Sequence, residues 1–354
     1  MIAAKIGASH NPGFAEARTP PEEHMPSPRS AWRGIGVSAI AAMAMAAFAA
    51  AAQGQANYPD RPVRVILPFG PGGVADVSTR LVAAKLSERM GQNFFVDNRP
   101  GAGGIVASKG ALSFPADGYT LFLSGNSAAI SHSLFASLPF DVTRDFTSVS
   151  LLAQFDMLLA TKMDTQFDSV QKLVAYSKQN PGKLNFGTIA AGSTQNLSAE
   201  LFKMATGTNA AIVTFRTTPE LITAIVRGDV DVGFDYYAAF SPMVAGKQIR
   251  IIATSGDEPS PLFAGVPTVK ASGYPNYVVT SWNGLSARTG SPADVVAKLN
   301  TEISAVLQMP EIRAQMADLG MEPLSSTPDA LTRRLKADIE KWRMVIYKAG
   351  IPKQ

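Results

Sequence analysis

The 354-residue chain contains no cysteine. This absence excludes disulfide bonds, thiolate catalysis and metal sites built on cysteine. Histidine is almost as scarce, because the chain holds only His10, His24 and His132. The Gly-x-Ser-x-Gly turn of many serine hydrolases is also missing. General-base chemistry would therefore depend on a carboxylate such as Asp76 or Asp235.

A strong charge of either sign is lacking as well. The formal net charge is +4, and the basic residues are scattered rather than clustered. Nucleic-acid binding and membrane-surface binding therefore have little support. A slight positive excess favours the approach of an anion, but only weakly.

The first 56 residues look like an export signal rather than folded structure. Met1–Arg33 is polar and carries basic residues, and Gly34–Ala52 is an uncharged run dominated by alanine. Gly54-Gln55-Ala56 then places small residues where a signal peptidase cleaves. This order is typical of a secretory signal peptide over residues 1–56. The alternative is a transmembrane anchor, although alanine is only weakly apolar.

The most informative segment is Val63–Asp76, with the sequence VRVILPFGPGGVAD. Val63–Leu67 predicts a buried strand, Pro68–Gly73 a loop with few side chains, and the helical spacing begins at Val74. Backbone N–H groups at such a helix start have no intrahelical partner, so the junction predicts an anion site. The loop lacks the lysine of a Walker A motif and the glycine spacing of a dinucleotide fingerprint.

Similar polar loops follow other apolar strands. They are Ser124–Ser127, Ala191–Thr194 and Arg216–Thr218. Strands alternate with helices along the chain, which predicts an α/β fold with mainly parallel sheets. Loops at the carboxyl ends of such strands line a ligand crevice.

Helix caps and acidic residues add detail. Ser169 lies in a Ser-x-x-Lys sequence but is better explained as a helix N-cap than as a nucleophile. Thr218 before Pro219 predicts another helix start. Asp229, Asp231 and Asp235 alternate along one predicted strand, and solvation explains them better than a cation site does. Asp235 ends that strand, where the crevice should lie. The Ser291–Asp294 and Thr327–Asp329 segments each predict a capped helix start with proline at its first position.

Taken together, these segments resemble the Bug-type extracytoplasmic solute receptors, the substrate-binding proteins of tripartite tricarboxylate transporters. The resemblance runs in order through Tyr58–Pro62, Pro68–Gly73, Asn98–Gly104, Pro115–Leu121, Leu138–Asp141, Arg144–Phe146, Asn180–Phe186, Gly228–Asp231, Phe234-Asp235, Gly265–Val269 and Lys341-Trp342.

The resemblance implies a type II periplasmic-binding fold, with two α/β lobes and a central ligand cleft. Lobe 1 would comprise residues 58–154 plus 286–354, and lobe 2 residues 155–285, with crossings near Gln154–Met157 and Ser281–Ser286. It also implies a periplasmic monomer that needs no cofactor or metal. Such a receptor captures a small organic carboxylate and delivers it to membrane permease subunits, without transforming it.

Nine ligand-binding residues follow from the resemblance by position. The first anion loop would supply Phe69, Gly72, Gly73 and Asp76, the second Asn126 and Ser127, the third Ser193 and Thr194, and the opposite wall Asp235. Arg216 belongs to a departure from the family pattern, Thr214–Pro219. It could grip a carboxylate with about 1.5–3 kcal/mol, or point to solvent at the rim.

Two other functions stay open at this point. An exported hydrolase or isomerase could use the same cleft, and a receptor-derived sensory partner of a signalling protein would share the fold. The identity of the carboxylate is open too, because a site lined by backbone leaves little side-chain signature.

Overall fold

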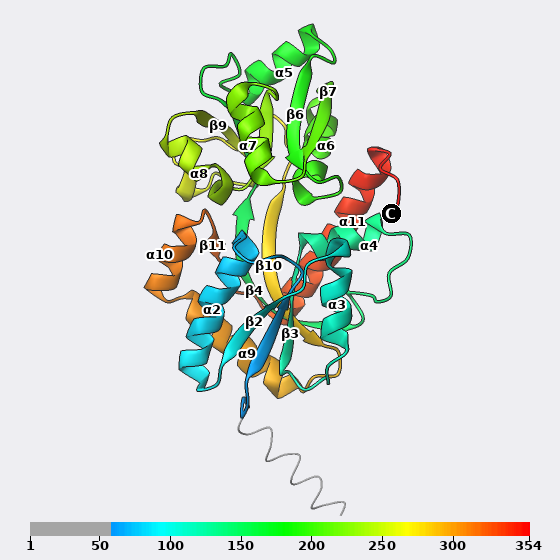
Figure 1. Cartoon of the computed structure of the whole chain (residues 1–354), viewed down its shortest axis with the longest axis vertical. Helices are drawn as coiled ribbons and strands as arrows, with labels where there is room; N and C mark the ends of the chain where they lie inside the picture. The colour runs from blue at the N-terminus through cyan, green and yellow to red at the C-terminus, as the bar shows by residue number, and fades with distance from the viewer. Residues whose placement is uncertain (1–57) are drawn as a thin grey trace, which may run out of the picture. The chain divides into compact units, whose positions relative to one another are not determined.

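A computed structural model describes residues 58–354, whose fold is built on two β-sheets (Figure 1). The predicted signal peptide lies outside the described residues. Helices pack on both faces of each sheet, so the α/β prediction is confirmed.

The first sheet has the strand order β11-β4-β10-β3-β1-β2. Its strands are β1 (Val63–Leu67), β2 (Phe94–Asn98), β3 (Thr120–Gly125), β4 (Phe146–Asp156), β10 (Thr280–Arg288) and β11 (Glu322–Pro323). Its helices are α2 (Val74–Met90), α3 (Ile105–Leu112), α4 (Asn126–Leu134), α9 (Ala293–Leu307), α10 (Pro310–Asp318) and α11 (Pro328–Lys348), with a 3-10 turn η1 (Ala102–Gly104) before α3.

The second sheet has the order β7-β6-β8-β5-β9. Its strands are β5 (Leu158–Lys162), β6 (Leu184–Ile189), β7 (Ala210–Phe215), β8 (Val232–Asp235) and β9 (Ile249–Thr254). Its helices are α5 (Val170–Gln179), α6 (Thr194–Thr206), α7 (Thr218–Arg227) and α8 (Tyr237–Ala245), with a 3-10 turn η2 (Pro261–Phe263) after β9.

Side-chain alternation explains how each sheet is covered. On β1, Val63, Val65 and Leu67 face the core shared with α2, α9 and α10, whereas Ile66 faces the core shared with α3, α4 and α11. The second sheet packs α5 and α6 on one face and α7 and α8 on the other. Each sheet is thus the middle layer of a three-layer α/β arrangement.

The prediction of mainly parallel sheets is wrong, because both sheets are mixed. Strands β2, β1 and β3 run parallel, as do β7, β6 and β8. However, β10 pairs antiparallel with β3 and β4, and β5 pairs antiparallel with β8 and β9. Strand–helix alternation also fails between β4 and β5, which belong to different sheets and are separated by Met157 alone. Parallel strands of one sheet would need a crossover connection, usually a helix, between them.

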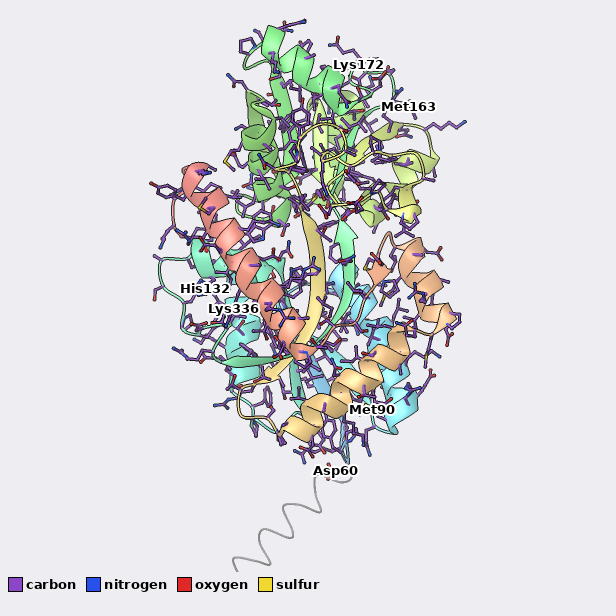
Figure 2. The ribbon with its side chains drawn as sticks, turned by 180° about the vertical axis from the view of Figure 1, so that it is seen from behind. Asp60, Met90, His132, Met163, Lys172 and Lys336 are labelled. Carbon is purple, nitrogen blue, oxygen red and sulfur yellow. The ribbon has the colours of Figure 1, made fainter. Side chains whose placement is uncertain are left out.

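Two strands carry the chain between the sheets. β4 leads directly into β5, and β10 returns to the first sheet alongside it, with Ser281 opposite Phe155. Figure 1 shows β10 running up the middle of the molecule toward the second sheet. α11 packs on α4 and β4 and also touches α6, as the view from behind shows beside the labelled His132 and Lys336 (Figure 2).

Two of the four predicted helix caps are confirmed. The Ser169 and Thr327 hydroxyls accept hydrogen bonds from the backbone N–H groups of Lys172 and Ala330. Two starts differ from the prediction. Thr217 caps α7 in place of Thr218, and α9 begins at Ala293, where Pro292 holds the cap position.

Candidate functional site

A cavity of about 700 Å³ lies between the two sheets and takes its walls from both of them. Its lining includes residues at the starts of five helices, α2, α4, α6, α7 and α8, together with β10. Helix N-termini present unpaired backbone N–H groups and a partial positive charge. Their convergence on one cavity makes it suited to an anion.

Asp76 holds the first wall, the Pro68–Gly73 loop, in place. Its carboxylate accepts hydrogen bonds from the Gly72 backbone N–H at 2.9 Å and from the Arg80 and Asn98 side chains. Burial alone would raise the pKa of Asp76, but these hydrogen bonds outweigh it and hold the pKa below its usual value. Gly72 has φ +85°, which an L side chain would strain. Asp76 therefore supports the loop and is not among the cavity-lining residues.

The second wall is formed where β3 ends and α4 begins. Gly125 pairs with Asn283 of β10, and a Cβ at Gly125 would lie 2.6 Å from the Trp282 carbonyl oxygen. Asn126 follows at the first position of α4. Asn126 and Asn283 both line the cavity and are 4% and 3% exposed.

The third wall is the loop between β6 and α6. The Ser193 hydroxyl accepts from the Asn196 backbone N–H at 3.1 Å and donates to the Ile189 carbonyl at 2.8 Å. The Gly192 N–H donates to the Asn196 side-chain oxygen at 3.0 Å. These bonds shape the loop that carries Ser193 and Thr194 into the cavity lining.

Asp235 ends β8 at the opposite wall. It accepts hydrogen bonds from Gln195 Nε2 at 3.0 Å, from the Thr218 hydroxyl at 2.9 Å and from the Tyr236 backbone N–H at 2.9 Å. Burial nevertheless raises the pKa of this carboxyl, because the side chain is almost fully enclosed. Asp235 is the only Asp or Glu side chain among the lining residues.

Two aromatic side chains complete the cavity between the connecting strands. The Tyr236 hydroxyl lies 3.0 Å from the Ser281 hydroxyl, and the Tyr236 ring packs edge-on against Phe155. Trp282 donates its indole N–H to Asp338 of α11 at 2.6 Å. Burial raises the pKa of the Tyr236 hydroxyl, so this group keeps its proton at neutral pH.

The two sheets' layers touch on both sides of the cavity. On one side, a Cβ at Gly192 would lie 2.7 Å from Leu134 of α4. On the other, a Cβ at Gly320, between α10 and β11, would lie 2.5 Å from the Tyr237 Cβ of α8. Both glycines have positive φ, so each position needs glycine for its backbone and for the close approach.

The remaining lining is neutral and largely apolar. No lysine, arginine or histidine is among the lining residues. Apolar side chains cover much of the surface, among them Val74, Ile130, Leu134, Phe135, Phe155 and Ile189. An anion held here would be bound by peptide N–H groups, hydroxyls and amides rather than by a salt bridge.

The structure brings together most of the residues that the sequence suggests. The following line the cavity: Phe69, Gly72, Gly73, Asn126, Ser127, Ser193, Thr194 and Asp235. Asp76 lies behind the first wall, and Arg216 is exposed and outside the lining. Their roles toward a ligand stay predictions.

Sequence reasoning missed Gln195, Tyr236 and Asn283 as lining residues, whereas Thr218 belongs to the predicted crevice loop Arg216–Thr218 but was not selected as a ligand contact. Gln195 and Tyr236 directly follow residues that were selected, so the first helical turn after each strand was a usable signal. Asn283 had no such signal, because its place depends on the pairing of β10 with β3.

The acidic residues near Asp235 do not gather around one point. Asp231 accepts from the Asn185 backbone N–H, and Asp229 pairs with Arg227. Over residues 58–354, no three metal-ligating side chains cluster together. Within the same range, none of the helices combines the length and apolar character that a bilayer span requires.

Comparison with known proteins places these features in context. Residues 78–351 match the family model described as "Tripartite tricarboxylate transporter family receptor". The protein BugT of Bordetella pertussis is 32% identical, over 83% of this chain and 91% of BugT. A UPF0065 protein of Pseudomonas sp. strain P51 is 30% identical, over 87% of this chain and 92% of its own length.

Solved structures agree with this fold. The Rhodopseudomonas palustris protein Rpa4515 with adipate is 32% identical, with a TM-score of 0.74, over 83% of this chain and 99% of that one. MatC of the same organism, with bound malate, is 28% identical, with a TM-score of 0.70, over 82% and 100%. The periplasmic binding protein BugD is 26% identical, with a TM-score of 0.71, over 84% and 100%. The two-lobe α/β fold predicted from the sequence is thereby confirmed.

Proposed function

Because this chain belongs to the tripartite tricarboxylate transporter receptor family, we propose that it captures a small organic carboxylate between its lobes and delivers it to the permease subunits of such a transporter. One observation carries the ligand class: five helix N-termini meet at a cavity whose lining has no cationic side chain. Peptide N–H groups at helix starts suit an anion of low charge.

Two relatives support a carboxylate ligand, since Rpa4515 is solved with adipate and MatC with malate. We extend this class, and not either compound, to the present chain. The predicted residues Phe69, Gly72, Gly73, Asn126 and Ser127 would contact the ligand from lobe 1. Ser193, Thr194 and Asp235 would contact it from lobe 2.

Capture would proceed by closure of the two lobes around the ligand, with β4 and β10 as the connecting strands. A ligand that contacts both lobes binds the closed form more tightly than the open one, and so shifts the population toward it. We propose that the protein acts in the periplasm as a monomer without chemical conversion of its ligand. The predicted signal peptide would direct its export.

A thermal-shift and calorimetry screen of residues 57–354 tests this function. The panel should contain mono-, di- and tricarboxylates, with the methyl ester of each acid as its uncharged control. A true ligand at one hundred times its Kd should add about 2.7 kcal/mol to the free energy of unfolding. Binding of the esters but not of the acids would contradict the proposal.

A matched pair of variants tests the role of peptide N–H groups. Val74 is the first residue of α2, and Gly73 before it is extended, with ψ 169°, so proline fits at this position. Val74→Pro removes the backbone N–H, whereas Val74→Ala shortens the side chain and keeps it. We expect Val74→Pro to weaken carboxylate binding by about ten-fold relative to Val74→Ala. Equal affinities would show that this helix start does not hold the ligand.

A further inference from the structure

Two buried amides in the cavity have hydrogen-bonding atoms without partners. Neither the oxygen nor the nitrogen of the Asn126 side-chain amide has a partner among residues 58–354, and the same holds for Asn283 Nδ2. Both side chains are more than nine-tenths buried, and both line the cavity. They are neighbours in the fold, since Asn283 lies opposite Gly125, the residue before Asn126.

Unpartnered amides of this kind are costly in a folded protein. A buried polar atom that has lost water and gained no partner destabilises the native state. Asn126 is not needed to cap α4, because the cap position is Gly125 and no side-chain cap bond is made there. A role in ligand binding therefore explains the two amides better than a role in stabilising the fold.

The chemistry of the three atoms restricts the ligand. Asn126 Nδ2 and Asn283 Nδ2 are donors and suit the oxygens of a carboxylate. Asn126 Oδ1 is an acceptor, and a carboxylate has no hydrogen to give it. The ligand must then bring a donor close to its carboxylate, because Asn126 stands at the start of α4, where the N–H groups favour the anion.

We propose that this cavity selects carboxylates that carry a hydroxyl or amino group on the carbon next to the carboxylate. Asn126 recognises this group by accepting a hydrogen bond from it. The inference rests on the proposed function and specifies its ligand class. Asn283 contributes a second donor to the carboxylate. A site built to pair with a ligand hydroxyl rejects the analogue that lacks it, because the protein's own polar atom is then left unpaired.

Matched ligand pairs provide the test. Calorimetry should compare succinate with malate, and hexanoate with 2-hydroxyhexanoate, since each pair differs only in the 2-hydroxyl group. Aspartate and 2-aminohexanoate are the amino-substituted members of the two series. Comparing them with the hydroxy acids shows whether the site prefers a hydroxyl or an ammonium group as the donor. In at least one series we expect the substituted acid to bind at least about ten-fold more tightly than the plain acid.

Three variants separate the role of Asn126 from general damage to the fold. Asn126→Leu has the same number and branching of side-chain heavy atoms and no polar atom, so the preference should fall to within about two-fold. Asn283→Leu should weaken both members of a pair and keep their ratio, because it removes only a donor to the carboxylate. The same exchange at exposed Asn276, Asn276→Leu, should change neither. The melting temperature of unliganded Asn126→Leu should not fall, since no native hydrogen bond is lost.

The outcomes are distinguishable. Carboxylates that bind without preference for the substituted member would overturn this inference and leave the proposed function standing. A preference that survives Asn126→Leu would also overturn it. If no carboxylate binds at all, the proposed function fails and this inference fails with it.

Discussion

At the scale of single residues, Arg216 is the predicted ligand contact whose position fits the alternative of a solvent-facing side chain at the rim. Its guanidinium suits a carboxylate, but the residue is exposed after β7 and lies outside the cavity lining. Its backbone N–H donates to Glu220 Oε2 at 3.1 Å, which ties this loop to the first turn of α7.

From this position we expect Arg216→Ala to change carboxylate affinity by less than about two-fold, because an exposed charge contributes little. Calorimetry on the variant and on Lys172→Ala, an exposed control in α5, would measure it. A loss of several-fold in Arg216→Ala alone would instead support the ligand role that the sequence suggests.

Asp156, at the end of β4, is a half-buried carboxyl in the connecting strands. Burial raises its pKa to about 6, with a hydrogen bond from Thr280 and the charge of Arg334 opposing the shift and Glu322 adding to it. An acid with a raised folded-state pKa stabilises the native state at low pH. That stability is complete below the unfolded pKa of about 4 and is lost as the pH rises through about 6.

We therefore predict that Asp156→Asn removes a decline in the free energy of unfolding between pH 4 and pH 7, on the order of 2–3 kcal/mol. Urea unfolding across this range would measure the decline in the parent protein. The exposed carboxyl Asp164 supplies a matched control, and Asp164→Asn should leave the pH profile unchanged. A profile that is the same in the parent and in Asp156→Asn would contradict the prediction.

Site residues were predictable where they lie in sequence beside a strand end. Gly72, Asn126, Ser193 and Asp235 each follow or end an apolar strand, and that pattern is visible without a structure. Thr218 shows the limit, because its neighbour Thr217 makes the cap bond and Thr218 is left to donate to Asp235. The observed helix start differs from the predicted one by a single residue, and Thr218 is therefore a hydrogen-bond donor to Asp235 and not the helix cap.

At the scale of secondary-structure elements, α11 supports the site from a distance. It packs on β4 and α4, and its Asp338 accepts the indole hydrogen bond of Trp282, which lines the cavity. Both side chains are buried. The last long helix of the chain therefore helps to orient a residue of the binding site.

Removing this acceptor should affect stability and binding together. Asp338→Leu leaves a buried indole N–H unpaired, and we expect a loss of about 1–3 kcal/mol of stability together with weaker ligand binding. Asp338→Asn keeps a carbonyl acceptor and should lose less of both. Urea unfolding and calorimetry on the two variants would compare them, and an equal loss would argue against the role of the hydrogen bond.

The elements themselves were largely predictable, but the sheet directions were not. Caps at Ser169 and Thr327 and the apolar alternation of β1 are local signals. The antiparallel placement of β10 depends on partners far away in the chain, β3 and β4. Strand–helix alternation suggests parallel pairing and contains no information about a strand that returns from the other sheet.

At the scale of the whole molecule, two glycines mark where the lobes meet. Gly320 approaches Tyr237 on one side of the cavity, and Gly192 approaches Leu134 on the other. The lobe boundaries predicted from the sequence stay predictions until movement is measured, and Gly320 offers a way to measure it.

We predict that Gly320→Ala opposes closure. Its Cβ would lie 2.5 Å from the Tyr237 Cβ, and separation of the lobes would relieve this contact. Gly91 is a matched control, because its φ of +72° is close to the +71° of Gly320 and nothing lies within 4 Å of its Cβ position. Each alanine costs about 1–2 kcal/mol of backbone strain, but only Gly320→Ala should also weaken ligand binding, by about ten-fold. Equal affinities in the two variants would show that this contact does not limit closure.

The gathering of helix starts around a cavity without cationic side chains has a consequence for evolution. Outside the wall glycines Gly72, Gly125 and Gly192, every residue except proline supplies a peptide N–H, so most substitutions there leave anion binding intact. Gene duplicates can therefore accumulate changes in wall size and polarity while each copy still recognises an acid. Such a fold can evolve toward new ligands by single substitutions, because each intermediate still binds an acid.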